Sequence, residues 1–237
     1  MRWRLRGLYA LVVLSLGVVA CGGGEDLGGD RLDTNPVLLQ AASAEAMGSV
    51  TSVRFDLIRT GAPVFIDQID SISLDKLEGR FQSPGSADAI LQVTVNESLG
   101  TKLGAVAIAD EVWLSNPVTG KFETLPAGFD LDPSLFFDPK DGWQPLLEGL
   151  TNVTFIGEQD RDGARYHLTA TALSNNMEAI TAGLVRGQNV DLDLWIHPVT
   201  ADVRAIEFST ELDGAVTDWV LELRDFGEEF SIEPPEQ

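Results

Sequence analysis

The amino-acid sequence predicts an α+β protein: one large, curved antiparallel sheet of about ten strands, with a few short helices on one face. Three observations lead to this fold class. Many short segments alternate apolar and polar residues, only a few stretches show the helical period, and no linker-like stretch interrupts residues 36–232. A twisted sheet of this size curls, so helices on its concave face would leave a long apolar cleft.

The strands are predicted from strict alternation between turn signals. In the first, Val53, Phe55 and Leu57 alternate with polar residues, which is typical of a half-buried strand. Gly100 and the 159–163 segment supply hairpin turns. The predicted strands are 53–57, 74–81, 89–95, 103–109, 111–115, 153–157, 165–171, 190–196, 204–212 and 216–225.

Two helices and one irregular insert complete the predicted order. Asn35-Pro36 starts a helix that Gly48 ends, and Ser174 caps a second helix whose apolar face extends to Leu184. Four prolines within residues 126–145 forbid a long helix or ladder there. Because that segment is nonetheless rich in Leu, Phe and Trp, it is expected to fold onto the core as loop and short helical turns.

The N-terminus predicts an exported lipoprotein. Three arginines precede an apolar run from Leu8 to Val19, the layout of a signal peptide that is too short to serve as a membrane span. The following Val18-Val19-Ala20-Cys21 resembles the bacterial lipobox, which implies cleavage before Cys21 and its acylation, for example by palmitate. A buried free cysteine is the alternative. The predicted divisions are a signal peptide at 1–20, a flexible tether at 21–35 and one domain at 36–237.

Composition and motifs exclude several function classes. A formal net charge of -21 opposes binding to nucleic acid. The single cysteine excludes a disulfide framework and a cysteine-based metal site, and no hydrolase or nucleotide-binding motif is present. His167 and His197 are expected to be solvated, and the Asp doublets at 130/132, 160/162 and 191/193 match no calcium loop. We therefore expect no enzyme, no cofactor and no metal site.

The sequence contains many apolar residues for a sheet that is covered by so few helices. In 103–109, Gly104, Ala105, Ala107 and Ala109 are small, so they either leave a void or let a helix approach closely. We expect a cavity wall and a gate in the proline-rich insert. The candidate wall residues are Leu91, Val93, Val95, Val106, Ile108, Leu168, Leu192 and Leu194, and the candidate gate residues are Phe136, Phe137 and Trp143.

Four segments carry a recognisable pattern: the strand at 113–115, Phe137 to Trp143 with the following Leu146-Leu147, the turn at Gly163 and the strand 191–197. In this order they resemble one family of mycobacterial lipoproteins, LppX/LprAFG. The resemblance implies a half-barrel similar to LolA/LolB. It also implies a cavity for acyl chains of envelope lipids, such as triacylated glycolipids or phthiocerol dimycocerosates.

The function expected from these features is a bacterial lipoprotein, anchored in the cell membrane or envelope through Cys21, that binds acyl chains of lipids or glycolipids and carries them across the envelope. A membrane transporter is a further candidate partner. The alternative is an envelope scaffold or sensor that binds a protein. A carrier of multi-chain lipids predicts a cavity at or above roughly 1,000 Å³, whereas a scaffold predicts a packed core and a large exposed apolar patch.

Overall fold

A computed structural model describes residues 29–67, 69–109, 111–125, 137, 142–181 and 183–236. The helices are α1 (Pro36–Gly48), α2 (Trp143–Glu148) and α3 (Ser174–Ile180). The strands are β1 (Ser52–Gly61), β2 (Ile72–Gln82), β3 (Ser86–Val95), β4 (Leu99–Ile108), β5 (Glu111–Ser115), β6 (Phe122–Thr124), β7 (Thr151–Asp160), β8 (Ala164–Ala172), β9 (Val190–Ile196), β10 (Val203–Leu212) and β11 (Ala215–Arg224).

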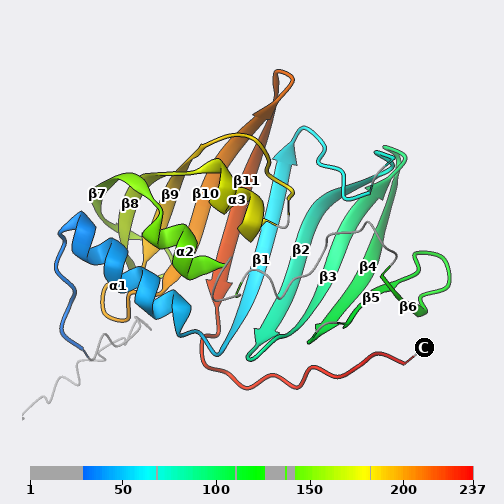
Figure 1. Cartoon of the computed structure of the whole chain (residues 1–237), viewed down its shortest axis with the longest axis horizontal. Helices are drawn as coiled ribbons and strands as arrows, with labels where there is room; N and C mark the ends of the chain where they lie inside the picture. The colour runs from blue at the N-terminus through cyan, green and yellow to red at the C-terminus, as the bar shows by residue number, and fades with distance from the viewer. Residues whose placement is uncertain are drawn as a thin grey trace, which may run out of the picture.

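The strands form one open antiparallel sheet in the order β6-β5-β4-β3-β2-β1-β11-β10-β9-β8-β7. The predicted fold class is thereby confirmed, with eleven strands in place of about ten. The additional strand is β6, whose three residues are too few to show alternation. The first and last strands pair at the centre of the sheet (Figure 1). The chain proceeds outward from β1 to the edge strand β6, then begins again at the opposite edge with β7 and returns to the centre at β11.

The central strands present an apolar row to the concave face and a largely polar row to the convex face. Leu57 pairs with Leu77 on β2 and with Leu221 on β11, while the adjacent Asp56 pairs with Glu78 and Glu222. Because paired residues point to the same side, the core residues form continuous rows across the sheet. Each fully buried leucine contributes about 1.5–3 kcal/mol relative to exposure.

The three helices lie on one side of the sheet, over the half that contains β7 to β11 (Figure 1). Asn35 caps α1 through its side-chain oxygen, which accepts from the amides of Val37 and Leu38, and Pro36 occupies the first helical turn. Gln40 on α1 donates to the carbonyls of Leu147 and Leu150, at 2.8 and 3.1 Å, and so ties α1 to the end of α2.

α3 is shorter than its sequence pattern predicts. It ends at Ile180, and the amide of Gly183 donates to the carbonyl of Glu178 with Gly183 at a φ of 76°. Glycine adopts this left-handed conformation without steric cost, so the helix ends there. Leu184 lies beyond the helix but still packs against the core.

The end of the predicted tether contacts the sheet. The amide of Leu32 donates to the carbonyl of Pro198, and Tyr166 on β8 donates through its hydroxyl to the carbonyl of Leu32. Arg31 pairs with Glu158 on the edge strand β7. Cys21 and the predicted signal peptide lie outside the described residues.

Candidate functional site

An apolar cavity lies between the concave face and the two short helices α2 and α3, which we call the roof. Its volume is about 30 Å³. Ordinary ligand sites measure about 300–1,000 Å³. The cavity is therefore much smaller than a ligand site, and the large cavity predicted for a carrier of multi-chain lipids is not present in the described part of this structure. The lining residues are Leu57, Trp143, Leu146, Met177, Ile180, Thr181, Leu184, Leu192, Ile206, Phe208, Trp219 and Leu221.

Inward-facing residues of three adjacent strands form the floor of this cavity. Leu192 on β9 pairs with Phe208 on β10, and Phe208 pairs with Trp219 on β11. The rings of Phe208 and Trp219 stack with centroids 5.9 Å apart. The floor is therefore a rigid apolar surface, fixed by the pairing of three adjacent strands.

The roof consists of two short helices, α2 with six residues and α3 with seven. In α2, Trp143, Leu146 and Leu147 are all buried. Asn176 on α3 donates from its side-chain nitrogen to the carbonyl of Pro145 in α2 at 3.2 Å, which couples the two helices. Side-chain hydrogen bonds and a buried apolar face hold α2 in place, whereas backbone ladders hold the strands beneath it.

The two tryptophans of the cavity differ in their hydrogen bonding. Trp219 donates from Nε1 to Oγ1 of Thr210 at 3.0 Å. Trp143 is 2% exposed, and its Nε1 is buried without a hydrogen-bond partner.

A wider groove of about 650 Å³ adjoins the cavity, and Leu184 lines both. The groove lies between the β1–β2 connection, the segment after α3 and the β10–β11 hairpin, and it carries the charged residues Asp67, Asp70, Arg186 and Asp213. Burial raises the pKa of Asp67, but hydrogen bonds from the Ser71 hydroxyl and from the amides of Ile72 and Ser71 outweigh it, and the net pKa is lowered.

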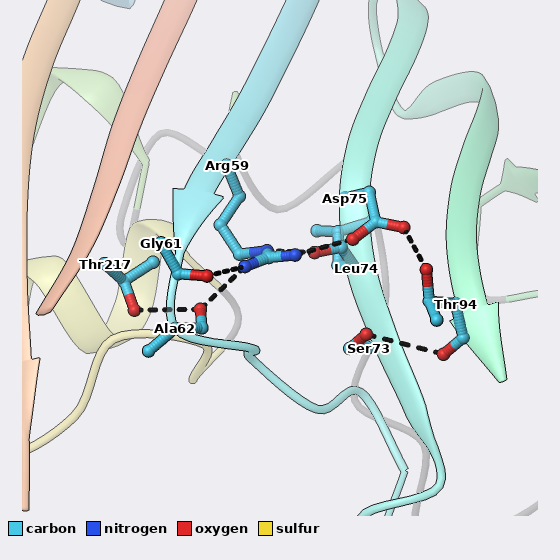
Figure 2. Close-up of polar contacts among 8 residues, drawn as sticks. All are labelled: Arg59, Gly61, Ala62, Ser73, Leu74, Asp75, Thr94 and Thr217. Carbon is cyan, nitrogen blue, oxygen red and sulfur yellow. Dashed lines mark hydrogen bonds and ion pairs between the residues drawn. The ribbon is translucent and has the colours of Figure 1, made fainter. Parts of the chain in front are cut away.

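The β1 end of this region is held by Arg59 (Figure 2). Its guanidinium donates to the carbonyls of Leu74, Gly61 and Ala62 and pairs with Asp75 at 2.5 Å. Asp75 lies where the β2–β3 register shifts, and it also accepts from the hydroxyl of Thr94 at 2.7 Å. Because four of the guanidinium N–H groups are already engaged, we assign Arg59 a structural role.

The predicted wall residues divide between the two faces. Leu192 lines the cavity; Leu91, Val93, Leu168 and Leu194 lie in the same buried core without lining it, and Val95 packs at its periphery. Val106 and Ile108 were placed on the wrong face: they pair with Asp88 and Ser86 and share the convex side with them. The inward residues of β4 are Leu103, Ala105 and Ala107.

Size explains this error. The sequence interpretation assigned the larger residues of 103–109 to the interior. In the structure, Phe81 occupies the same concave row as Ala87 and Ala107, and Phe137 stacks on Phe81 at 4.4 Å. Two large rings fill the space, so the neighbouring inward positions take alanine.

The predicted gate residues have different positions. Trp143 begins the roof and lines the cavity, Phe137 lies on Phe81 and Phe55, and Phe136 is outside the described residues. The sequence interpretation missed Ile206, Phe208, Trp219 and Leu221, although the alternation in 204–212 and 216–225 marks all four as inward.

The two histidines are not solvated, contrary to expectation. His167 contacts Asp193 through Nε2 at 2.6 Å and Gln159 through Nδ1 at 2.8 Å, and it stacks on Trp195. His197 is 7% exposed, and its Nδ1 accepts from the amide of Thr200 at 3.1 Å. Neither lines the cavity.

No group of three or more His, Cys, Asp or Glu side chains within the described ranges is placed to hold a metal ion. No helix in this part of the chain combines the length and apolar character needed to cross a membrane. The side chains that line the cavity are apolar or aromatic except for Thr181, so they can bury apolar groups.

The fold and the cavity define the class to which the protein belongs. Its members consist of a single open sheet whose apolar concave face is covered by short helices. The chain belongs to the LppX_LprAFG lipoprotein family, whose sequence model matches residues 35–232. This confirms the family predicted from the ordered segments.

Solved structures share the fold. LprF from Mycobacterium bovis superposes with a TM-score of 0.66 at 16% identity, covering 88% of this chain and 100% of that one. The Mycobacterium tuberculosis lipoprotein LppX gives 0.57 at 18% identity, covering 84% and 100%. A LolA superfamily protein from Nitrosomonas europaea gives a TM-score of 0.27 at 11% identity, covering 81% of this chain and 92% of that one. A search of curated proteins gives no significant match.

Proposed function

We propose that this protein is a bacterial envelope lipoprotein that binds acyl chains of envelope lipids or glycolipids between its sheet and its roof, and carries them across the envelope. The observation that carries the proposal is the cavity itself: eleven of its twelve lining side chains are apolar or aromatic, and the twelfth is Thr181. Family membership supports it.

Burial supplies the affinity. An acyl chain of sixteen carbons, at about 0.8 kcal/mol per methylene, gains on the order of 10 kcal/mol before the cost of ordering it. No charged group is needed, and none lines the cavity. The same physics requires no catalytic step, so we propose a carrier and not an enzyme.

Uptake requires the cavity to expand. A volume of about 30 Å³ holds at most a few atoms, so an acyl chain can enter only if the roof and the sheet separate. We propose that the segment of Phe136, Phe137 and Trp143 is the gate, because Trp143 belongs to the movable roof. Lifting α2 would break the three Gln40 contacts and the Asn176 contact.

Attachment to the membrane is proposed through acylated Cys21, with residues 22–30 as a spacer. Because the body carries a large negative charge, anionic headgroups would repel it from the bilayer surface. A membrane transporter that supplies or accepts the lipid is a proposed partner.

Mass spectrometry of organic extracts tests the proposal. The protein is purified from its own host, delipidated, and then offered a fluorescent fatty acid. We expect co-purifying acyl lipids and a saturable fluorescence increase. An empty extract together with no uptake would rule out the carrier function.

The closed cavity also favours a second candidate, an envelope scaffold or sensor that binds a protein partner, because that function needs a packed core. The same experiment separates the two. A scaffold would yield no lipid and no uptake, while the lipidated protein would still capture a specific envelope protein.

A further inference from the structure

The hairpin between β10 and β11 projects beyond the ends of the neighbouring strands (Figure 1). Every residue from 211 to 216 is exposed, and two of them are large and apolar, Leu212 at 74% and Val216 at 50%. The β1–β2 connection carries Ile69, which is 82% exposed, and β4 begins with Leu99, which is 64% exposed. The three connections lie at the same end of the sheet (Figure 1), so large apolar side chains gather there in contact with water.

The exposed apolar side chains of the hairpin lie on both of its faces. Alternation places Leu212 and its partner Ala215 on the concave side, in the row of Phe208. It places Val216 on the convex side, where it pairs with Glu211. A partner that docks against one side of the hairpin would cover only one of these faces, whereas a medium that surrounds the hairpin would cover both.

The hairpin also borders the wide groove that adjoins the cavity. Leu212 and Ala215 line this groove together with Val64 and Phe65 of the β1–β2 connection, and Leu184 lines both the groove and the cavity. An acyl chain that leaves the cavity through the groove would therefore emerge beside the hairpin. Because each methylene exposed to water is unfavourable, transfer is easiest when the hairpin already contacts an apolar acceptor.

Acidic side chains accompany these apolar positions. Glu211 and Asp213 lie on the hairpin, Asp70 follows Ile69, and Glu97 lies in the β3–β4 turn; all four carboxylates belong to exposed residues. They would repel anionic headgroups, and they would equally repel the same end of a second copy of this chain. The surface that fits this end is therefore apolar within and carries no net negative charge.

The predicted tether is bound at the other end of the sheet. The amide of Leu32 donates to the carbonyl of Pro198 in the β9–β10 turn. From that turn, β10 runs to the hairpin over ten residues, a length of about 33 Å. An anchor at Cys21 would hold the tether end near its own membrane and leave the hairpin pointing away from it.

We propose that the β10–β11 hairpin, together with Ile69 and Leu99, inserts its apolar side chains into a second lipid surface that carries no net negative charge. The groove beside the hairpin then connects the cavity to the acyl layer of that surface. This inference rests on the proposed function, because it assigns the place where the cargo passes between the protein and a membrane.

A vesicle-bridging assay with the full protein tests this assignment. The protein is held on bead-bound donor vesicles by a C-terminal histidine tag and a nickel-chelating lipid, because the C-terminus lies away from the hairpin (Figure 1). Fluorescent acceptor vesicles of phosphatidylcholine are then added at equal protein load. We expect the wild type to capture them, and Leu212→Ser combined with Val216→Ser to weaken capture about tenfold or more, because two apolar side chains no longer insert.

Val37→Ser combined with Leu38→Ser is the matched control, because it also removes two exposed apolar side chains, but from α1. Its capture should equal that of the wild type. Acceptor vesicles that contain phosphatidylglycerol should be captured less, and Asp70→Asn combined with Asp213→Asn should reduce that difference. All the changed residues are exposed, and unfolding in urea checks that each variant is folded.

Failure of this inference is distinguishable from failure of the proposed function. If the wild type captures no phosphatidylcholine vesicles, or if the hairpin variant captures as many, the inference is wrong while uptake of a fluorescent fatty acid still supports the carrier. If vesicles are bridged but no fatty acid is taken up, the carrier function fails and the docking site stands. An envelope protein cross-linked at position 212 without vesicle capture would overturn the inference and assign the hairpin to a protein partner.

Discussion

The two faces of the sheet use the same alternating strands for different purposes. On β9, Leu192 and Leu194 point to the concave side and lie within the core, while Asp191 and Asp193 point outward and bond Thr171 and His167. The convex face also carries the Arg80–Asp88 pair and Arg161, whose guanidinium lies 4.0 Å from the ring centroid of Trp195. Apolar burial therefore holds one face, and polar contacts between neighbouring strands cover the other.

The two faces should differ most in how much a change of charge lowers the free energy of unfolding. Leu192→Asp places a carboxylate in the apolar floor, and we expect it to lower the free energy of unfolding by more than about 4 kcal/mol. Asp191→Asn, one residue earlier on the convex face, should cost less than about 1 kcal/mol. Urea unfolding followed by circular dichroism measures both. Similar losses for the two variants would contradict the assignment of faces.

Tryptophan substitutions on the two faces should have different effects on lipid loading, even where both lower stability. Val93 lies in the concave core outside the cavity lining, and an acyl chain longer than the cavity would extend along this face. We therefore expect Val93→Trp to block loading of a fluorescent fatty acid while costing about 1–3 kcal/mol of stability. Leu91→Trp should act in the same way.

Val106→Trp is the control for these variants, because Val106 lines a convex groove of about 550 Å³ that can accept the larger ring. Its loading should equal that of the wild type. Unchanged loading in Val93→Trp would remove that residue from the path of the acyl chain.

For nearly every strand, the sequence alone predicts that apolar and polar residues alternate, and therefore which residues share a face. It does not predict which face is inside where residue sizes mislead, as at Val106 and Ala107. The pairing of β1 with β11 joins residues far apart in the chain, and no local pattern contains it. The closed roof and the unpaired N–H of Trp143 depend on side-chain packing, which a single sequence does not specify.

The smallest expected effect concerns the charges of the convex face. Glu78 lies 2.5 Å from Lys76, and the hydrogen bond from that ammonium lowers its pKa against the opposing effect of burial. Stabilisation from this pair is present above the unfolded pKa of Glu78 and is lost as the pH falls through its lowered folded value.

Lys76→Met should therefore reduce stability at pH 7 by less than about 1 kcal/mol, because both groups are partly exposed. The difference from the wild type should vanish in strongly acidic solution. Urea unfolding at several pH values measures it, and a difference that grows as the pH falls would contradict the direction of the shift.

Tryptophan fluorescence tests the central claim, that acyl chains occupy the concave face. Four of the five tryptophans lie in the described residues: Trp143 and Trp219 line the cavity, whereas Trp113 and Trp195 belong to the convex rows. A lipid brominated along its acyl chain quenches only the rings it contacts. We predict strong quenching in the protein that carries Trp113→Phe and Trp195→Phe, and little in the protein that carries Trp143→Phe and Trp219→Phe. Quenching of the convex pair, or of neither pair at saturating lipid, would contradict the account.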